Sequence, residues 1–175
     1  SSMSSDFLST FRVRGAIGKS GQQPTAFAHL TTFVPETSFE GPGVTPGNLG
    51  NPDLKPEVST EIEGGFEAGM FNDRVGLEFT YWDRVVNDAI VLRQFPISGG
   101  FLSLQADNIG QIDANGIDLN LRVSAMKREN LSLDVFANGA YISETVTDLG
   151  GAPRLKAGGS YPRYRNHIDE GYAPG

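Results

Sequence analysis

The clearest feature of this sequence is an alternation of apolar and polar residues with a period of two. Between residues 57 and 70, the even positions are apolar or uncharged, whereas the odd positions include four glutamates. Successive side chains of a β-strand point to opposite faces, whereas a helix would mix these two sets of residues. The pattern therefore predicts a long strand with one apolar and one acidic face.

The same alternation occurs in four other segments, at residues 7–17, 75–81, 117–125 and 131–141. Several of these patterns continue for about ten residues. A tilted membrane-spanning strand has roughly 9–11 residues, whereas a soluble strand typically has about five or six, so the observed length matches the membrane-spanning strand better.

The connections between the predicted strands alternate between short and long. Residues 71–74 and 126–130 are short enough for hairpin turns, and the first contains turn-forming Asn and Asp. The other connections are long: residues 19–56, about 88–113, and 143 onward. Six of the ten prolines lie in 19–56, so we expect an irregular loop there.

Long strands with connections of this kind are typical of an all-β, antiparallel up-and-down transmembrane β-barrel with short periplasmic turns and long extracellular loops. Aromatic residues near the predicted strand ends, such as Tyr81 and Tyr141, agree with the aromatic girdles of such barrels. A soluble β-sandwich also alternates, because its apolar face covers a core. The pattern favours the barrel and leaves the sandwich open.

Composition excludes several other classes of protein. The 175 residues include 14 Lys or Arg and 21 Asp or Glu, which gives a net charge of −7, and there is no basic block of the kind that binds nucleic acid. The chain has no cysteine and only two, isolated, histidines, so we expect neither a thiolate site nor a multi-histidine metal site. We also expect no cofactor.

The acidic face of the strand at 57–70 raises the question of catalysis. Carboxylates two positions apart on a strand point the same way at roughly 7 Å, as Glu61 and Glu63 would, and paired carboxylates hydrolyse glycosides. However, a row exposed to water offers no apolar pocket that would keep one carboxyl protonated as a general acid. We find no nucleophilic triad either. We therefore expect no enzyme and assign no catalytic residue.

Several motifs resemble segments of the TonB-dependent outer-membrane transporters. Residues 51–57 (NPDLKPE), followed by Glu61 and a glycine, resemble the point where that family's chain returns from an extracellular loop into a barrel strand. Residues 71–75 (FNDRV) and the strand after them resemble the next periplasmic turn and ascending strand, and the sets at 108–110 and 115–118 resemble the segment that follows. Residues 11–18 (FRVRGAIG) and 167–175 resemble stretches of the SusC/RagA-like branch.

This resemblance implies active uptake of a scarce nutrient across the bacterial outer membrane, with energy delivered by the TonB system. In the SusC/RagA-like branch the cargo is typically an oligosaccharide or a peptide, and a surface lipoprotein lid is the usual partner. Nothing in the chain matches the family's plug domain. A barrel of roughly 22 strands needs more than 175 residues, so we expect residues 1–175 to be part of a single transmembrane β-barrel domain whose other partners are lipid, the remainder of the barrel and a plug.

On this interpretation, the polar faces of the strands line the lumen, where they hydrate the channel, contact the plug or contact cargo. Trp82 points to the polar face, unlike Tyr81, and is a candidate ligand contact. The lumen-facing candidates are Arg12, Arg14, Glu61, Glu63, Glu67, Glu78, Trp82, Asp118, Asn120 and Arg122.

Two other functions stay open at this point. The main one is a soluble exported β-sandwich that binds glycans through loop aromatics. The other is a small closed barrel that acts as a membrane anchor or an adhesin.

Overall fold

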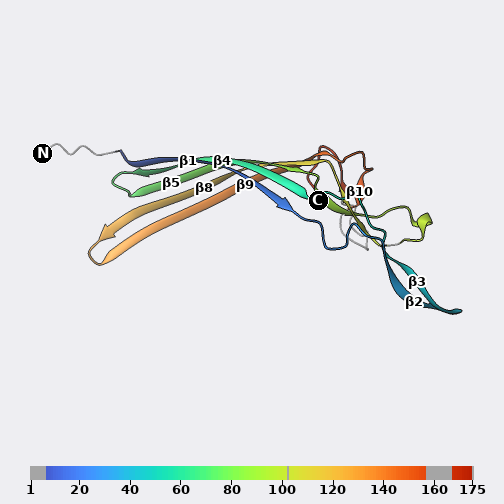
Figure 1. Cartoon of the computed structure of the whole chain (residues 1–175). Helices are drawn as coiled ribbons and strands as arrows, with labels where there is room; N and C mark the ends of the chain where they lie inside the picture. Colours follow the sequence, from blue (N-terminus) through green and yellow to red (C-terminus); the bar gives the residue numbers. More distant parts are fainter. Residues whose placement is uncertain (1–6, 102, 157–166, 175) are drawn as a thin grey trace. The chain divides into compact units, whose positions relative to one another are not determined.

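The computed structural model of the chain describes residues 7–101, 103–156 and 167–174. Its main element is a five-stranded sheet in which the strands are neighbours in chain order, β1-β4-β5-β8-β9 (Figure 1). All five segments with alternating polarity form strands of this sheet, and the hairpin turn predicted at 71–74 is confirmed. The strands are β1 (Leu8–Gln22), β4 (Glu57–Met70), β5 (Val75–Asn87), β8 (Gln111–Arg128) and β9 (Leu131–Asp148).

Contacts between β5 and β8 show that neighbouring strands run antiparallel. Gly76, near the start of β5, lies against Arg122, and Trp82, further along β5, lies against Gly116, which is earlier in β8. The strands β4 and β5 are joined by residues 71–74, and β8 and β9 by residues 129–130. The sheet is therefore an up-and-down meander with short turns at one end.

The turn at 71–74 has an unusual backbone. Phe71, Asn72 and Asp73 have φ values of 55°, 57° and 59°, in the left-handed region that costs an L-residue roughly 1–2 kcal/mol. Strand β1 supports this conformation, because Thr10 Oγ1 donates a hydrogen bond to Asp73 Oδ1 at 3.0 Å and the Asp73 N–H donates one to Ser9 Oγ at 3.2 Å. The start of β1 thus holds the turn between β4 and β5.

The chain divides into two compact units. Unit 1 comprises Ser1–Gly18, Thr60–Arg84 and Ala114–Ser143, and contains most of the five long strands. Unit 2 comprises Lys19–Ser59, Val85–Asp113 and Glu144–Gly175, and contains the long connections.

The apolar face of unit 1 is exposed. Val13 and Ile17 are each 74% exposed. The rings of Phe11, Phe66 and Phe79 form a row across three strands, with centroids 5.8 and 5.6 Å apart. A β-sandwich would bury such rows against a second sheet. The exposure of Val13 and Ile17 on this face favours contact with lipid.

In its described residues, unit 2 has a small apolar core and three two-stranded sheets. The core comprises Ala89, Ile109, Val146, Leu149 and Leu155. The sheets pair β2 (Thr32–Ser38) with β3 (Gly41–Asn48), β6 (Ile90–Arg93) with β7 (Gln105–Asn108), and β10 (Leu155–Lys156) with β11 (His167–Ile168), and a 3-10 turn, η1, spans Ile97–Gly99. Among the described residues, no helix has the length and apolar character needed to cross a membrane.

The prediction of an irregular loop over residues 19–56 is wrong in part, because β2 and β3 form a regular hairpin inside it. Pro35, Pro42 and Pro46 lie within these strands. A proline lacks an N–H donor, but each strand of a two-stranded ribbon has an unpaired edge on which that loss is tolerated. The connection at 88–113 likewise contains β6 and β7. Part of the connection predicted after residue 143 lies outside the described residues.

Candidate functional site

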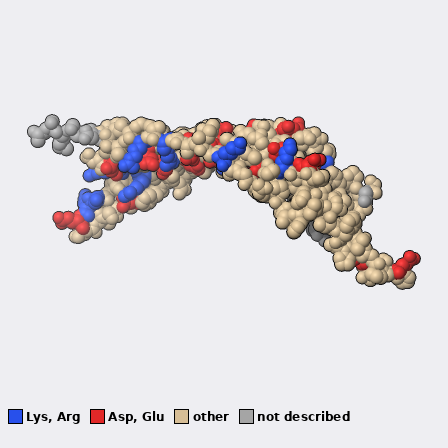
Figure 2. All heavy atoms as spheres, viewed as in Figure 1, with Lys and Arg blue, Asp and Glu red and all other residues tan. Residues whose placement is uncertain are grey.

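The polar face of unit 1 carries charged side chains of both signs. Figure 2 shows Lys and Arg interleaved with Asp and Glu on this part of the molecule. The central group is Arg14 of β1, whose guanidinium lies 3.3 Å from Glu67 Oε1 on β4 and 2.8 Å from Glu78 Oε1 on β5. It also donates a hydrogen bond to Thr80, which is buried. One arginine thus links three strands.

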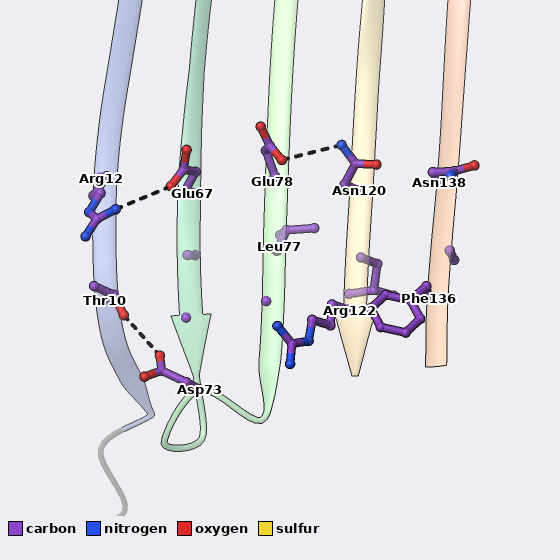
Figure 3. Close-up of a pocket in the computed structure, with 15 residues that line it drawn as sticks. Thr10, Arg12, Glu67, Asp73, Leu77, Glu78, Asn120, Arg122, Phe136 and Asn138 are labelled. Carbon is purple, nitrogen blue, oxygen red and sulfur yellow. Dashed lines mark hydrogen bonds and ion pairs between the residues drawn. The ribbon is translucent and has the colours of Figure 1, made fainter. Parts of the chain in front are cut away.

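This network continues on both sides of Arg14. Arg12 lies 3.9 Å from Glu67 Oε2, and Asn120 of β8 donates a hydrogen bond from Nδ2 to Glu78 Oε2 at 3.4 Å. Figure 3 shows four of the side chains on successive strands, namely Arg12 on β1, Glu67 on β4, Glu78 on β5 and Asn120 on β8. Four adjacent strands are therefore connected by one chain of polar contacts, which we call the Arg14 network.

A cleft of about 470 Å³ opens beside the Arg14 network, toward the turn at 71–74. At its β8–β9 side, the guanidinium of Arg122 lies 6.0 Å from the ring centroid of Phe136. The polar and charged side chains that line the cleft are Thr10, Arg12, Glu67, Asp73, Glu78, Asn120, Arg122 and Asn138. This lining can hold polar groups of either charge. No cluster of metal-ligating side chains occurs among the described residues.

A second polar cluster surrounds Trp82. The guanidinium of Arg84 lies 5.1 Å from the centroid of the Trp82 ring, and its Nε is 2.6 Å from Glu61 Oε2. A Cβ on Gly116 would lie 2.5 Å from the indole, so the ring packs where β8 has no side chain. The indole already has contacts with this chain, and its role as a ligand contact stays a prediction.

The structure brings together five of the ten predicted lumen residues, whereas the other five lie outside that group. Arg12, Arg14, Glu67, Glu78 and Asn120 form the Arg14 network. Arg122 lines the cleft, whereas Glu61 and Trp82 belong to the second cluster. Strand alternation puts Glu63 and Asp118 on the same polar face, but within the described part of the chain they do not join the network.

The sequence interpretation did not single out several residues of these clusters. Arg84 lies beyond the end of the alternation recognised at residue 81, although it continues the face of Trp82. Phe136 is an aromatic residue on the polar face of the strand predicted at 131–141, and this unusual position could have identified it as a candidate. Thr10, Asp73 and Thr80 carry no such signal, because their contacts depend on how β1, β4 and β5 are aligned.

Long antiparallel strands, an exposed apolar face and a charged opposite face together define a wall segment of an outer-membrane β-barrel. The family model for the "TonB dependent receptor-like, beta-barrel" matches residues 5–172. The chain belongs to this family.

Proteins named as TonB-dependent receptors are among its relatives. The TonB-dependent receptor P26 of Formosa agariphila is 28% identical over 145 residues, which are 80% of this chain and 14% of the receptor. The receptor P39 of the same organism is 21% identical over 155 residues, which are 87% of this chain and 15% of that receptor. The chain thus spans about one-seventh of the length of these relatives.

Solved structures of the RagAB transporter resemble the chain in fold. The RagAB peptide transporter superposes with a TM-score of 0.83 at 25% identity, over 97% of this chain and 19% of that chain. The RagAB peptide importer in its "open-open" state gives a TM-score of 0.75 at 26% identity, over 96% of this chain and 18% of that chain.

These matches confirm three of the predictions. The chain is an all-β, antiparallel segment of a barrel of this family, the resemblance to the SusC/RagA-like branch holds, and the location is the bacterial outer membrane.

Replacing Arg14 with methionine is expected to lower the free energy of unfolding by about 1 kcal/mol, because exposed ion pairs contribute roughly 0.2–1 kcal/mol each and Arg14 forms two. Methionine keeps most of the aliphatic stem and removes the charge. Urea denaturation of the whole receptor in lipid vesicles measures this change in the free energy of unfolding. Arg12→Met is the control, because its single contact is longer and its side chain is 75% exposed. Equal losses from the two variants would contradict the central position of Arg14.

Proposed function

We propose that this chain is part of a TonB-dependent outer-membrane transporter that actively takes up a nutrient such as an oligosaccharide or a peptide. The observation that carries the proposal is the match of residues 5–172 to the family's β-barrel. The exposed apolar face and the charged opposite face of unit 1 support it, since these are the lipid side and the water side of a barrel wall. The RagAB proteins, described as a peptide transporter and importer, support uptake as the activity.

In this proposal, residues 1–175 are part of a single transmembrane barrel domain, and the cargo passes without covalent change. The partners are the outer-membrane lipid, the remainder of the barrel, a plug, the TonB system and a surface lipoprotein lid. The turns at 71–74 and 129–130 are periplasmic, and the long connections of unit 2 are extracellular.

The polar face then lines the lumen, and its residues divide into two groups. The carboxylates of Glu67 and Glu78 are engaged by Arg14, so they hold the wall together. Glu63, Asp118 and Arg122 do not join the network, so their side chains are better placed to contact a plug or cargo. One group therefore holds the wall together and the other is available to a plug or cargo, and mutations in each group can test the two roles separately.

The test of the proposed function is uptake by cells that carry the whole receptor. Two labelled probes, a tryptic peptide mixture and a mixture of malto-oligosaccharides, are supplied to cells with and without the receptor. We expect the receptor to increase accumulation of one probe, and inactivation of TonB to abolish the increase. Uptake that depends on neither would contradict the proposal. A preparation of this chain that is monomeric and folded in detergent-free buffer would instead favour the soluble β-sandwich.

A further inference from the structure

The ribbon formed by β2 and β3 has two outer edges with which no other described strand pairs. Its strands have 7 and 8 residues, whereas the strands of the β6–β7 ribbon have 4 each. The outer edge of a strand presents unpaired N–H and C=O groups, which are a template for pairing with another chain. The length of the β2–β3 ribbon therefore exposes it to strand addition.

The composition of the ribbon increases this exposure. Glu36 and Glu40 are the only charged residues between 32 and 48. Phe33 is 61% exposed and Val44 is 70% exposed. Exposed segments that are low in charge and contain aromatic or β-branched residues add to other strands unless a charge or a proline interrupts them. We therefore expect the ribbon to carry a feature that keeps its edges from pairing.

The register of the ribbon determines which backbone groups point to its outer edges. Along an antiparallel pair of strands, the N–H and C=O groups of successive residue pairs point alternately toward the partner strand and away from it. Ser38 and Gly41 flank the two-residue turn at 39–40, and a turn of this length closes with a hydrogen bond between its flanking residues. That pair therefore points inward, and so does every second pair beyond it. The inward pairs are Ser38 with Gly41, Glu36 with Gly43, and Val34 with Thr45.

The pairs between them point outward, and all three prolines of the ribbon belong to these outward pairs. The outward pairs are Thr37 with Pro42, Pro35 with Val44, and Phe33 with Pro46. Proline has no N–H group, so at these positions it removes a donor from the edge and leaves the hydrogen bonds between β2 and β3 intact. Val44 is left as an isolated donor between the two prolines of β3, and Pro35 separates the two donors of β2. Neither edge keeps two successive outward donors.

The positions of prolines in the other strands support a role at free edges. None lies in the five long strands, of which β4, β5 and β8 are paired on both sides. In the proposed transporter, the outer edges of β1 and β9 pair with the remainder of the barrel. The short β6–β7 ribbon has no proline either. Among the described strands, prolines therefore occur only in the ribbon with long free edges, and there only at outward positions.

We propose that Pro35, Pro42 and Pro46 close the outer edges of the ribbon to strand addition, and that the strand they exclude is a second copy of β3 from a neighbouring receptor. Identical strands can pair antiparallel about a two-fold axis. With the axis at Val44, the two valines face each other as a favourable β-branched pair, whereas Pro42 of each copy faces Pro46 of the other. Every hydrogen bond of these two flanking pairs then lacks its donor. The single bonded pair that is left does not offset the entropy that two receptors lose on association.

The test restores the donors of β3 in the whole receptor with the double variant Pro42→Thr/Pro46→Thr. Threonine favours strands and adds no charge. Sedimentation velocity in detergent, over a range of receptor concentrations, measures self-association. We expect the self-association constant to rise by about tenfold or more over that of the unmodified receptor, because the two flanking pairs regain their hydrogen bonds.

Gly43→Thr is the matched control, because it adds the same side chain to β3 at an inward position. Within 4 Å, a Cβ at Gly43 would meet only the Glu36 carbonyl oxygen, at 3.9 Å, so the backbone there accommodates a side chain. Strand propensity rises in both variants, but only the double variant adds donors to the edge. Gly43→Thr is therefore expected to change the self-association constant by less than about twofold.

Hydrogen exchange resolved to single amides tests the assignment of the outward pairs. In the unmodified receptor, the N–H of Val44 is expected to exchange fast, whereas those of Gly43 and Thr45 are protected by their bonds to β2. This measurement needs no substitution, so it holds even if the double variant does not fold. At concentrations where the double variant associates, its Val44 N–H is expected to become protected.

A double variant that associates no more than the unmodified receptor overturns the proposal, and so does an equal increase in Gly43→Thr. A protected Val44 amide next to fast-exchanging amides at Gly43 and Thr45 overturns the assignment of the outward pairs. None of these measurements involves uptake. They can therefore fail in a receptor that shows TonB-dependent uptake, and a receptor without such uptake can still meet them.

Discussion

Replacing Leu121 with arginine is expected to destabilise the membrane-inserted receptor by about 2–4 kcal/mol, the range for a cation near mid-bilayer on the lipid face of a barrel. Leu121 shares the apolar face of β8 with Leu119, which is 43% exposed. Strand alternation places apolar residues of the neighbouring strands, such as Leu77 of β5 and Val135 of β9, on that face, whereas Glu78 offers a carboxylate on the other face. The guanidinium would have to sit among acyl chains or distort the bilayer.

The matched control is Asn120→Arg, one position earlier in the same strand. Asn120 points to the polar face, where its amide is 3.4 Å from Glu78 Oε2. An arginine there meets water and a carboxylate, so we expect a much smaller cost. The free energy of unfolding of the whole receptor, measured by urea titration in vesicles, compares the two variants. Equal costs, or a larger cost at 120, would show that the faces are assigned the wrong way round.

The alternation of polarity predicted the five long strands because each strand of unit 1 has one face in each of two environments. The same reasoning explains where the prediction stopped. Strand β8 begins at Gln111, whereas the regular pattern begins at residue 117. The first residues of β8 depart from simple alternation because they lie among protein groups: Ile112 packs against the core of unit 2, and Gly116 lies under Trp82.

The sequence predicted which residues share a face but not which of them touch. Arg12 and Arg14 look equivalent in the pattern, yet only Arg14 lies between two carboxylates. That difference depends on the register between β1, β4 and β5, which is set by backbone pairing along the whole strands. The contacts of Asp73 with Thr10 and Ser9 arise in the same way.

The long connections were the least predictable part of the fold. Prolines are typical of irregular loops, and the count of six in residues 19–56 predicted one. The ribbon forms nevertheless, because an isolated pair of strands tolerates prolines at its free edges. In β2 and β3 the prolines also alternate, and this places all three on one face. Proline spacing, rather than proline content, was the informative signal.

Replacing Gly65 with alanine is expected to destabilise the protein by about 1–3 kcal/mol, the usual cost of overpacking. A Cβ at this position would overlap the carbonyl oxygen of Phe79 and lie 3.2 Å from the Cα of Thr80. Both are backbone atoms of β5, so relief requires β4 and β5 to move apart rather than a side chain to rotate. Because Thr80 receives the hydrogen bond from Arg14, that movement would also loosen the Arg14 network.

Gly64 provides the matched control, because it is the adjacent residue of β4 on the opposite face and a Cβ there would meet nothing within 4 Å. Gly64→Ala is expected to be neutral or to stabilise the strand by about 0.5–1 kcal/mol, since alanine loses less backbone entropy on folding. Urea denaturation of both variants in vesicles, with near-ultraviolet circular dichroism to follow Trp82, measures the difference. If Gly65→Ala is as stable as Gly64→Ala, then β4 and β5 do not approach each other as closely as the distances at Gly65 indicate. In that case the close strand spacing on which the Arg14 network depends would be absent.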